Sequence, residues 1–545
     1  MNSLTLRRAL LGFAAACSSA SVLSAFDFVG SYDLGAVGNG EILSYTADAH
    51  TLLSTTSAVG VQVYDLTGSA LNARTSVGFG SLGSYKDVSS VAADPYGRGF
   101  GVASLVPTAN GTTAGAIAFF DYRTGSVLGS LEVGYHPDSL IFSADGSKLF
   151  ITNEGERTSG GDTDAPGSIS IVNLNLGALG SSQVQTYTFE SAHLAAGVST
   201  AGLRYNDTFT AGNAFRHIEP EYTTQVGNRL FVTLQENNGL AQFDLGTNQW
   251  VSVENMGLRT ITIDGSDRDG AGATASAQVN DTVKALPMPD TIASFVAGGT
   301  NYVVTANEGD YRGDDGDRTR VKDLGTKLDT AAVAAQYGPT WKSDAALGRL
   351  RVSNLDGDTN GDGKIDQLVV AGSRGFSVYN ADTGALVHDS GSLEEMLLAI
   401  DPAHFNLNAE NAGAANAGAI DARSPDKGPE PEALRVFTGD DGHTYLALGL
   451  ERQYGILLYD LADPSAPQQV GYLNTFGLDP ANGLAGIESI IHIGASESAD
   501  GREYLVAGFE YSGDLAVIAI PEPATYAALL GAGALGLAVW RRRRG

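Results

Sequence analysis

Hydrophobic and polar residues alternate along most of this chain in short runs that end at Gly, Asp or Asn. Such period-2 runs predict β-strands separated by turns. One stretch begins at Pro137-Asp138, passes through two alternating runs joined by a Gly turn, and ends at Asn153-Glu154. A second stretch repeats this order from Pro289-Asp290 to Asn307-Glu308. Because a third strand follows in several copies, as at 167–172 and 455–460, the chain is predicted to consist of repeated units of three or four strands.

This repeat predicts an all-β fold, a β-propeller of seven or eight blades of the WD or YVTN type, because a four-stranded sheet repeated around an axis forms a propeller. Blades need about 40–45 residues, so the longer gaps predict loop and short-helix insertions at 173–215, 309–347 and 391–428. Helices are expected over Asp329–Tyr337 and Leu393–Ile400, and a strand over Phe28–Leu34 is expected to close the last blade. An array of β-sandwiches is the alternative, but it gives no reason for the repeated acids described below. The predicted units start near residues 41, 90, 138, 221, 290, 366, 432 and 488.

The first 25 residues have the pattern of a secretory signal peptide. Arg7 and Arg8 precede an apolar run, and small residues follow up to a cleavage site near Ser24 or Ala25. A lipoprotein cleavage site at Cys17 is a second interpretation. The signal peptide leaves residues 26–520 as the predicted propeller domain.

The last 25 residues, 521–545, combine the motif Pro521-Glu522-Pro523, an apolar stretch over 524–540 and four arginines. This tail resembles the PEP-CTERM sorting signal, which exosortase recognises and cleaves in Gram-negative bacteria that make exopolysaccharide. The apolar stretch is just long enough to span a bilayer, and the arginines would stay cytoplasmic. A plain tail anchor is the alternative. We therefore expect export beyond the inner membrane to the cell surface or extracellular matrix, with transient anchoring by the tail.

Composition excludes several classes of protein. The 545 residues include 62 Asp or Glu against 33 Lys or Arg, for a formal net charge of -29. A charge this negative repels phosphate backbones, so a nucleic-acid partner is not expected. The chain has one Cys, which excludes a disulfide scaffold and a Cys-rich zinc module. With 43% hydrophobic residues the chain can bury a large core, and its expected inorganic partner is a hard cation.

Acidic residues recur at matching places in the repeat, because Asp or Glu opens the first strand and Glu ends most second strands. Equivalent positions of a propeller form rings around its axis, so these carboxylates are expected to gather at one rim of the channel. Close carboxylates repel each other and need a cation, an arginine or a raised pKa. Either they form a cation or ligand site, or they bond backbone amides and pair with Arg157, Arg312 or Arg452 to lock the blades together. The acids are Glu41, Asp138, Glu221, Asp290, Glu432 and Glu488 on first strands, and Glu154, Glu236, Glu308, Glu451 and Glu510 on second strands.

Residues 358–366 match the first nine positions of a calcium loop of EF-hand or dockerin type, with Gly at the sixth position. The twelfth position of the loop is Val369 instead of an acid, so an Asp upstream of the loop is expected to supply the missing calcium ligand. Strand-like residues at 350–352 and 368–370 predict that calcium holds a hairpin here, and a turn without metal is the alternative. The predicted ligands are Asp356, Asp358, Asn360, Asp362, the Lys364 carbonyl and Asp366.

Longer motifs resemble the choice-of-anchor I family. They include Glu-Pro-Glu-Tyr at 219–222, Thr-Ala-Asn-Glu-Gly-Asp at 305–310 and Lys-Gly-Pro-Glu-Pro-Glu at 427–432, and the resemblance covers nearly all of residues 35–520. It implies a secreted, propeller-like protein with one of several surface-anchoring tails, of which PEP-CTERM is one. Members are sometimes labelled alkaline phosphatase, but the resemblance implies no catalytic residues. The chain itself shows no zinc-ligand spacing among its histidines, no Gly-x-Ser-x-Gly elbow and no P-loop.

Three functional hypotheses remain. The first is a calcium-binding surface or matrix protein without established catalysis, which binds exopolysaccharide or a small ligand on one propeller face. The second is a calcium-dependent phosphoesterase similar to alkaline phosphatases or propeller phytases, in which rim carboxylates hold the ions that bind phosphate and activate water. The third is a purely structural role. For the phosphoesterase, the candidate ligands are Glu221, Glu308, Glu432 and Glu488, and the candidate phosphate-binding residues are Arg216, Arg312, Lys427 and Arg452.

Overall fold

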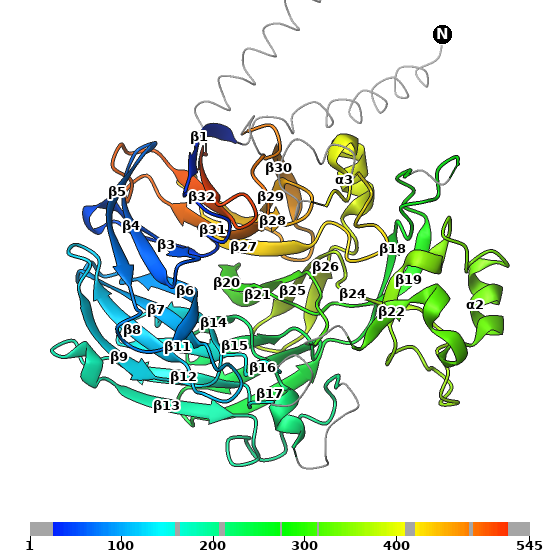
Figure 1. The fold of residues 1–545 in the computed structure, drawn as a ribbon, viewed down its shortest axis with the longest axis horizontal. Helices are drawn as coiled ribbons and strands as arrows, with labels where there is room; N and C mark the ends of the chain where they lie inside the picture. Colours follow the sequence, from blue (N-terminus) through cyan, green and yellow to red (C-terminus); the bar gives the residue numbers. More distant parts are fainter. Residues whose placement is uncertain are drawn as a thin grey trace, which may run out of the picture.

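The computed structural model describes residues 26–157, 164–205, 213–272, 275–312, 316–408, 420–478 and 483–520. Within these ranges, seven four-stranded antiparallel sheets lie around a common axis (Figure 1). The innermost strand of each sheet contacts the innermost strand of the next, and the seventh contacts the first. The prediction of an all-β propeller is confirmed, and the number of blades in the described chain is seven.

Each blade runs from its innermost to its outermost strand. Blade 1 is β2 (Leu43–Thr46), β3 (Thr51–Thr56), β4 (Gly60–Thr67) and β5 (Ala70–Gly78), and blade 2 is β6 (Tyr85–Ala93), β7 (Phe100–Pro107), β8 (Ala116–Asp121) and β9 (Val127–Glu132). Blade 3 is β10 (Pro137–Phe142), β11 (Lys148–Asn153), β12 (Ser168–Asn173) and β13 (Gln183–Thr188), and blade 4 is β14 (Thr223–Val226), β15 (Arg229–Leu234), β16 (Gly239–Asp244) and β17 (Gln249–Asn255). Blade 5 is β20 (Ile292–Ala297), β21 (Thr300–Asn307), β25 (Gly375–Asn380) and β26 (Leu386–Asp389), and blade 6 is β27 (Pro431–Thr438), β28 (Thr444–Leu450), β29 (Gly455–Asp460) and β30 (Gln468–Asn474). Blade 7 is β31 (Ile487–Ile493), β32 (Tyr504–Phe509), β33 (Asp514–Ala519) and β1 (Asp27–Asp33).

Hydrophobic clusters fill the space between every pair of neighbouring blades, including blades 7 and 1. The middle strands therefore bury both faces, which explains why β7 and β32 are buried along their whole length. Between blades 3 and 4, the fully buried Trp250 stacks on Phe189 with ring centroids 4.2 Å apart. This wedge-by-wedge packing explains how the ring is held together without disulfides.

The N-terminal strand closes the ring, as the sequence predicts. β1 pairs antiparallel with β33, from Asp27 opposite Ala519 to Asp33 opposite Asp514. Blade 7 thus takes three strands from the C-terminal end of the described chain and its outermost strand from the N-terminal end. The backbone hydrogen bonds between β1 and β33 therefore close the ring of blades.

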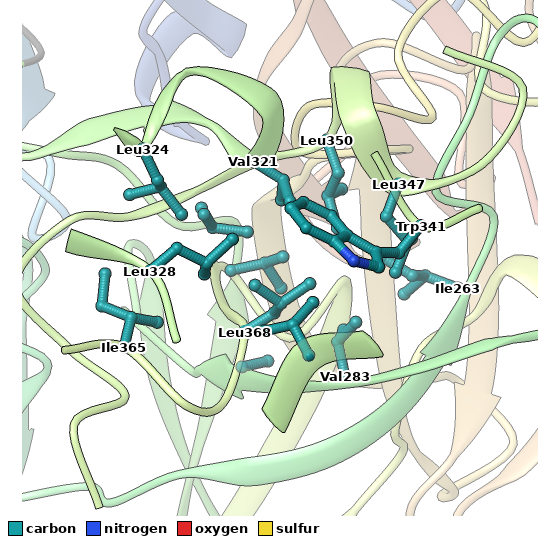
Figure 2. Close-up of a cluster of buried hydrophobic side chains, with 14 of the residues drawn as sticks. Ile263, Val283, Val321, Leu324, Leu328, Trp341, Leu347, Leu350, Ile365 and Leu368 are labelled. Carbon is teal, nitrogen blue, oxygen red and sulfur yellow. The ribbon is translucent and has the colours of Figure 1, made fainter. Parts of the chain in front are cut away.

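Two inserted segments, one before blade 5 and one between its strands β21 and β25, together form a separate lobe (Figure 1). It contains the sheet β18 (Arg259–Ile263), β19 (Asp281–Leu286) and β24 (Val369–Ala371), the pair β22 (Arg318–Arg320) and β23 (Arg351–Ser353), and α2 (Thr330–Tyr337). Its own core packs Trp341 among aliphatic side chains such as Leu347 and Leu350 (Figure 2). The predicted helices are confirmed: Asp329 caps α2 by accepting from the amides of Ala331 and Ala332, and α3 spans Glu394–Ile400. The short 3-10 turns are η1 (Asp48–His50), η2 (Leu179–Ser181), η3 (Ala214–His217), η4 (Val321–Asp323), η5 (Gly325–Lys327), η6 (Leu347–Arg349) and η7 (Pro402–His404).

Two sequence-based expectations are wrong in this lobe. The unit predicted to start near Asp366 is not a blade, because the strand that follows it, β24, pairs parallel with β19. The expected hairpin around 358–366 is also absent from the described fold, since β23 pairs with β22 while β24 pairs with β19. The alternating residues there do form strands, but these strands pair within the lobe and do not become part of a propeller blade.

The signal peptide at 1–25 and the sorting tail at 521–545, with its expected membrane span, lie outside the described residues. Among the residues that are described, no helix has the length and apolar character needed to cross a membrane.

Candidate functional site

Seven acidic side chains form a ring around one end of the propeller axis. Each lies within two residues of the start of an innermost strand. Their charges act on one another around the circle: Asp87 and Asp138 raise the pKa of Glu41, and Glu41 raises that of Glu488. Six members are those expected from the sequence, and together with the seventh they form what we call the acidic ring. The acidic ring is Glu41, Asp87, Asp138, Glu221, Asp290, Glu432 and Glu488.

Asp87 is the member that sequence reasoning missed. The repeat placed the start of this unit near Ser90, three residues too late. The register between β6 and β7 shifts between Asp87 and Ser90, so a bulge interrupts the regular alternation. The sequence does show an acid directly before the apolar Val88. In this copy of the repeat, however, Lys86 stands where several other copies have a Pro before the acid.

A repeated backbone conformation positions several ring acids. His136, Met288 and Glu430 each precede a Pro-acid pair and have φ of 46°, 47° and 51°. Positive φ is uncommon for such residues, so the surrounding structure must hold it. The amide of Met288 donates to Asn238 Oδ1 at 2.9 Å, for example. Register shifts follow in β10, β27 and β31, and such bulges turn side chains away from the regular pleat.

Glutamates at the ends of second strands form a second row beside the ring, at 154, 236, 308, 451 and 510. Glu308 raises the pKa of Asp290, and Glu451 raises those of both Glu432 and Glu488. The buried Asn307 holds the backbone directly before Glu308. Its Nδ2 donates to the hydroxyl of Ser377 on β25 at 2.8 Å and to that of Ser373, just before β25, at 2.9 Å. The expectation that both acidic series meet at one rim is confirmed by these interactions.

The acids come closest together where blades 5, 6 and 7 meet. Three sets of carboxylates each have oxygens within 4.8 Å of one another, and the sets share members. Oxygens bound to one Ca²⁺ lie within about 5 Å of each other, because each Ca–O distance is about 2.4 Å. Glu432 Oε2 is buried and has no hydrogen-bond partner, and the same is true of Glu236 Oε2. The sets are Asp290/Glu308/Glu432, Glu308/Glu430/Glu451 and Glu432/Glu451/Glu488.

Burial and mutual repulsion raise the pKa values of most of these carboxyls. Burial, then Glu510, raises the pKa of Glu41 to about 8. Burial and Glu154 raise that of Asp138 to about 7, and the pKa of Glu308 rises to about 7 through burial despite Lys427. Burial with neighbouring acids raises the pKa of Glu221 well above its usual range. The ring therefore holds protons, or another cation, at neutral pH.

Glu430, the acid that precedes Glu432 by two residues, has the opposite character. It is fully buried, and Lys427 Nζ lies 3.2 Å from its carboxylate, with Arg452 Nε at 3.4 Å. Arg423 also pairs with it. These three cations outweigh burial and hold the pKa of Glu430 well below its usual range. The sequence motif at 427–432 contains Glu430, but sequence reasoning singled out Glu432 instead.

The four residues suggested for phosphate binding all contact acids or carbonyls of this chain. Lys427 Nζ lies 2.6 Å from Glu308, and Arg452 Nη2 lies 3.0 Å from Glu451. Arg312 Nε lies 2.8 Å from Glu219 and also pairs with Asp164. Arg216 donates to the Asp164 carbonyl at 3.2 Å. Lys427 and Arg452 thus belong to the same cluster as the ring, whereas the Arg312 network joins the segment after β21 to Asp164 and Glu219.

The predicted calcium loop lies far along the chain in the inserted lobe and is exposed at 359–364. Asp358 accepts hydrogen bonds from the amides of Gly361 and Gly363 at 2.7 and 2.8 Å. Asn360 accepts from the amide of Asp362, which in turn accepts from Lys364. Asp366 accepts from Thr359. Asp356 instead pairs with Arg204 at 2.9 Å and accepts a hydrogen bond from the Ser353 hydroxyl.

Comparisons with known proteins identify two segments. Residues 41–464 match the Choice-of-anchor I domain, and residues 519–544 match the PEP-CTERM protein-sorting motif. Gigasin-3a from Magallana gigas is 38% identical over 123 residues, which are 22% of this chain and 42% of that protein, so the match spans less than half of the relative. The sorting motif implies processing by exosortase, export and a cell-surface location in Gram-negative bacteria.

Two solved structures show a remote similarity to this chain. A chain of the mitotic checkpoint complex has a TM-score of 0.44 at 9% identity, covering 90% of this chain and 93% of that one. Kuenenia stuttgartiensis hydrazine synthase has a TM-score of 0.44 at 10% identity, covering 89% and 98%.

Proposed function

The chain belongs to the choice-of-anchor I family. From this premise we propose that it is an exported surface protein whose acidic ring, together with the neighbouring Glu308, Glu430 and Glu451, binds calcium. Through the bound calcium it binds an anionic extracellular polysaccharide. The observation that carries this proposal is the group of three overlapping carboxylate sets between blades 5 and 7. Each set brings oxygens close enough to share one ion, and none of the sets contains a His or Cys. All-oxygen donors favour a hard cation such as Ca²⁺ over zinc.

The charge balance supports a cation more than a phosphate. The three carboxylate sets contain six different acids, and Lys427, Arg423 and Arg452 are the cations that pair with them in the described chain. A negative excess therefore remains around the unpartnered Glu432 oxygen. Phosphate would have to compete with carboxylates for Lys427 and Arg452, whereas a divalent cation relieves the repulsion directly. Calcium held by protein oxygens on one side can then bind uronate carboxylates of a polysaccharide on the other.

Glu432→Gln tests this site. Calcium binding to the full-length chain, measured by titration calorimetry, should lose one rim ion or weaken it at least tenfold, because Gln removes a charge from two of the three sets. Binding to the normal chain should also release protons, since calcium must displace them from carboxyls of raised pKa. Glu254→Gln, at an exposed Glu on β17, is the matched control. Unchanged calcium binding in Glu432→Gln would refute the rim site.

The ligand part of the proposal has its own test. The chain should sediment with a polyuronate gel in calcium and be released by chelator, and Glu432→Gln should sediment poorly. Neutral dextran is the control polymer. Turnover of a phosphomonoester or phytate that requires calcium and is lost in Glu432→Gln would favour the phosphoesterase hypothesis instead.

We also propose that the loop at 358–366 binds a second, structural calcium ion. Trypsin offers a local readout, because Lys364 is exposed at the centre of the loop. Calcium should slow cleavage after Lys364 at least fivefold, since its carbonyl becomes a ligand and the loop is held rigid. In Asp362→Asn this protection should disappear while rim binding persists. Equal cleavage with calcium and with chelator would contradict the loop site.

A further inference from the structure

A cavity of ≈ 380 Å³ lies on the propeller axis next to the acidic ring, because the ring member Glu488 is one of its lining residues. All seven blades line it with residues on, or directly before, their innermost strands. Its walls combine apolar side chains, such as Leu140, Phe142 and Ile490, with hydroxyl-bearing side chains and with the ionisable Arg435, Glu488 and His492. Ligand pockets typically have volumes of about 300–1,000 Å³, and the volume of this cavity lies in that range.

One wall position carries a positive charge. Arg435 lies on β27, three residues after the ring acid Glu432. The residues three positions after the other six ring acids are all uncharged: Ser44, Ser90, Ile141, Thr224, Ala293 and Ile491. A positive charge three residues after the ring acid therefore belongs to blade 6 and does not follow from the repeat.

No ion pair or hydrogen bond of the Arg435 guanidinium occurs within the described chain, although acids outnumber bases nearly two to one. The side chain is exposed, and it lines the cavity. The strands around it still remove much of its hydration, which lowers its pKa. Arginine remains protonated at neutral pH, so a positive charge without an ion-pair partner lines the cavity.

We propose that this axial cavity binds a small organic monoanion, a carboxylate with an apolar body, whose charged group pairs with Arg435. The planar guanidinium matches a carboxylate with two parallel hydrogen bonds. The apolar body would lie between Leu140 and Phe142 on one side and Ile490 on the other.

The acidic ring restricts the ligand to a single charge. Arg435 is three residues along the strand from Glu432, which corresponds to about 10 Å of extended chain. A second negative charge on the ligand would lie closer to the ring and would be repelled by it. This inference needs no bound calcium, so it stands or falls separately from the function proposed above.

Arg435→Gln tests the cavity site. Octanoate and 2-naphthoate are the probes, titrated into the full-length chain by calorimetry in chelator, with octanamide and 2-naphthamide as uncharged analogues. Acids should bind at least tenfold more tightly than amides to the normal chain, and this preference should disappear in Arg435→Gln. Arg435→Lys should retain part of it. Arg229→Gln, at an exposed Arg that begins β15 in blade 4, is the matched control.

Several results would overturn the proposal. Equal binding of acids and amides by the normal chain would show that Arg435 does not select charge. An unchanged preference in Arg435→Gln would place the acid elsewhere. Ala92→Phe, which narrows the cavity, should abolish binding of both probes while the melting temperature confirms folding. Retained binding in a folded Ala92→Phe chain would also place the ligand outside the axis.

Discussion

The calcium-free chain should lose stability as the pH rises from about 5 to about 8. The ring carboxyls of Glu41 and Asp138, and the neighbouring carboxyl of Glu308, have higher pKa values in the folded chain than in the unfolded chain, so the folded state binds more protons across this interval. Their contribution is complete below the unfolded value and is lost as the pH passes the folded value, about 7 for Asp138 and Glu308 and about 8 for Glu41. Glu308 alone, with a pKa raised from 4.5 to about 7, corresponds to about 3 kcal/mol.

Urea unfolding of the full-length chain at pH 5, 6.5 and 8 with chelator measures this loss. Saturating calcium should remove most of it, because the ion replaces the lost protons and binds only the folded ring. Glu41→Gln should reduce the pH dependence, since Gln stays neutral throughout. Stability that stays level or increases between pH 5 and 8 in chelator would contradict the assignment of raised pKa values to the ring.

Acids with the opposite shift determine the behaviour below this interval. Paired cations lower the pKa of Glu430, and the stability that this group contributes is present above its unfolded value and lost in acid. A maximum of stability near pH 5 is therefore expected for the calcium-free chain, with decreases on both sides.

Arg374→Ala should destabilise the chain by about 3–5 kcal/mol, because it leaves a buried carboxylate without its partner. Arg374 and Glu394 are both fully buried, with Nη1 and Oε1 2.5 Å apart. Arg374 also donates to the carbonyls of Ser424 and Asp426, at 3.0 and 2.7 Å. The arginine thus joins the start of β25 in blade 5, helix α3 and the segment that presents Lys427 to the rim.

Urea unfolding in saturating calcium compares this variant with two others. Lys322→Ala breaks a more exposed ion pair with Asp344 and should cost less than about 1 kcal/mol. Replacing both buried partners, Arg374→Met with Glu394→Met, should recover much of the loss, because no unpaired charge remains. A loss in Arg374→Ala as small as that in Lys322→Ala would show that the pair does not connect these segments.

The candidate site could be predicted only in part, and particular residues show why. Six ring acids follow from the repeat, because a propeller brings equivalent positions to one level. Asp87 does not, since a bulge whose position depends on pairing with β7 displaces it from the alternation. Asp356 is at a plausible spacing for the calcium loop, but Arg204, 152 residues away in the chain, pairs with it. Contacts over such distances leave no local pattern.

Sequence alone determined the all-β architecture, the repeated strand units, the closing strand β1, the capped helix α2 and the position of most rim acids, because these depend on hydrophobic periodicity and on residues close in the chain. Tertiary structure decided the number of blades, since the strand after Asp366 pairs with β19 in the inserted lobe. It also decided which acids share a site and which are neutralised by Lys427, Arg423 and Arg452. The reason is that pKa values and ion sites depend on distances across blades and on burial, and the closed ring sets both.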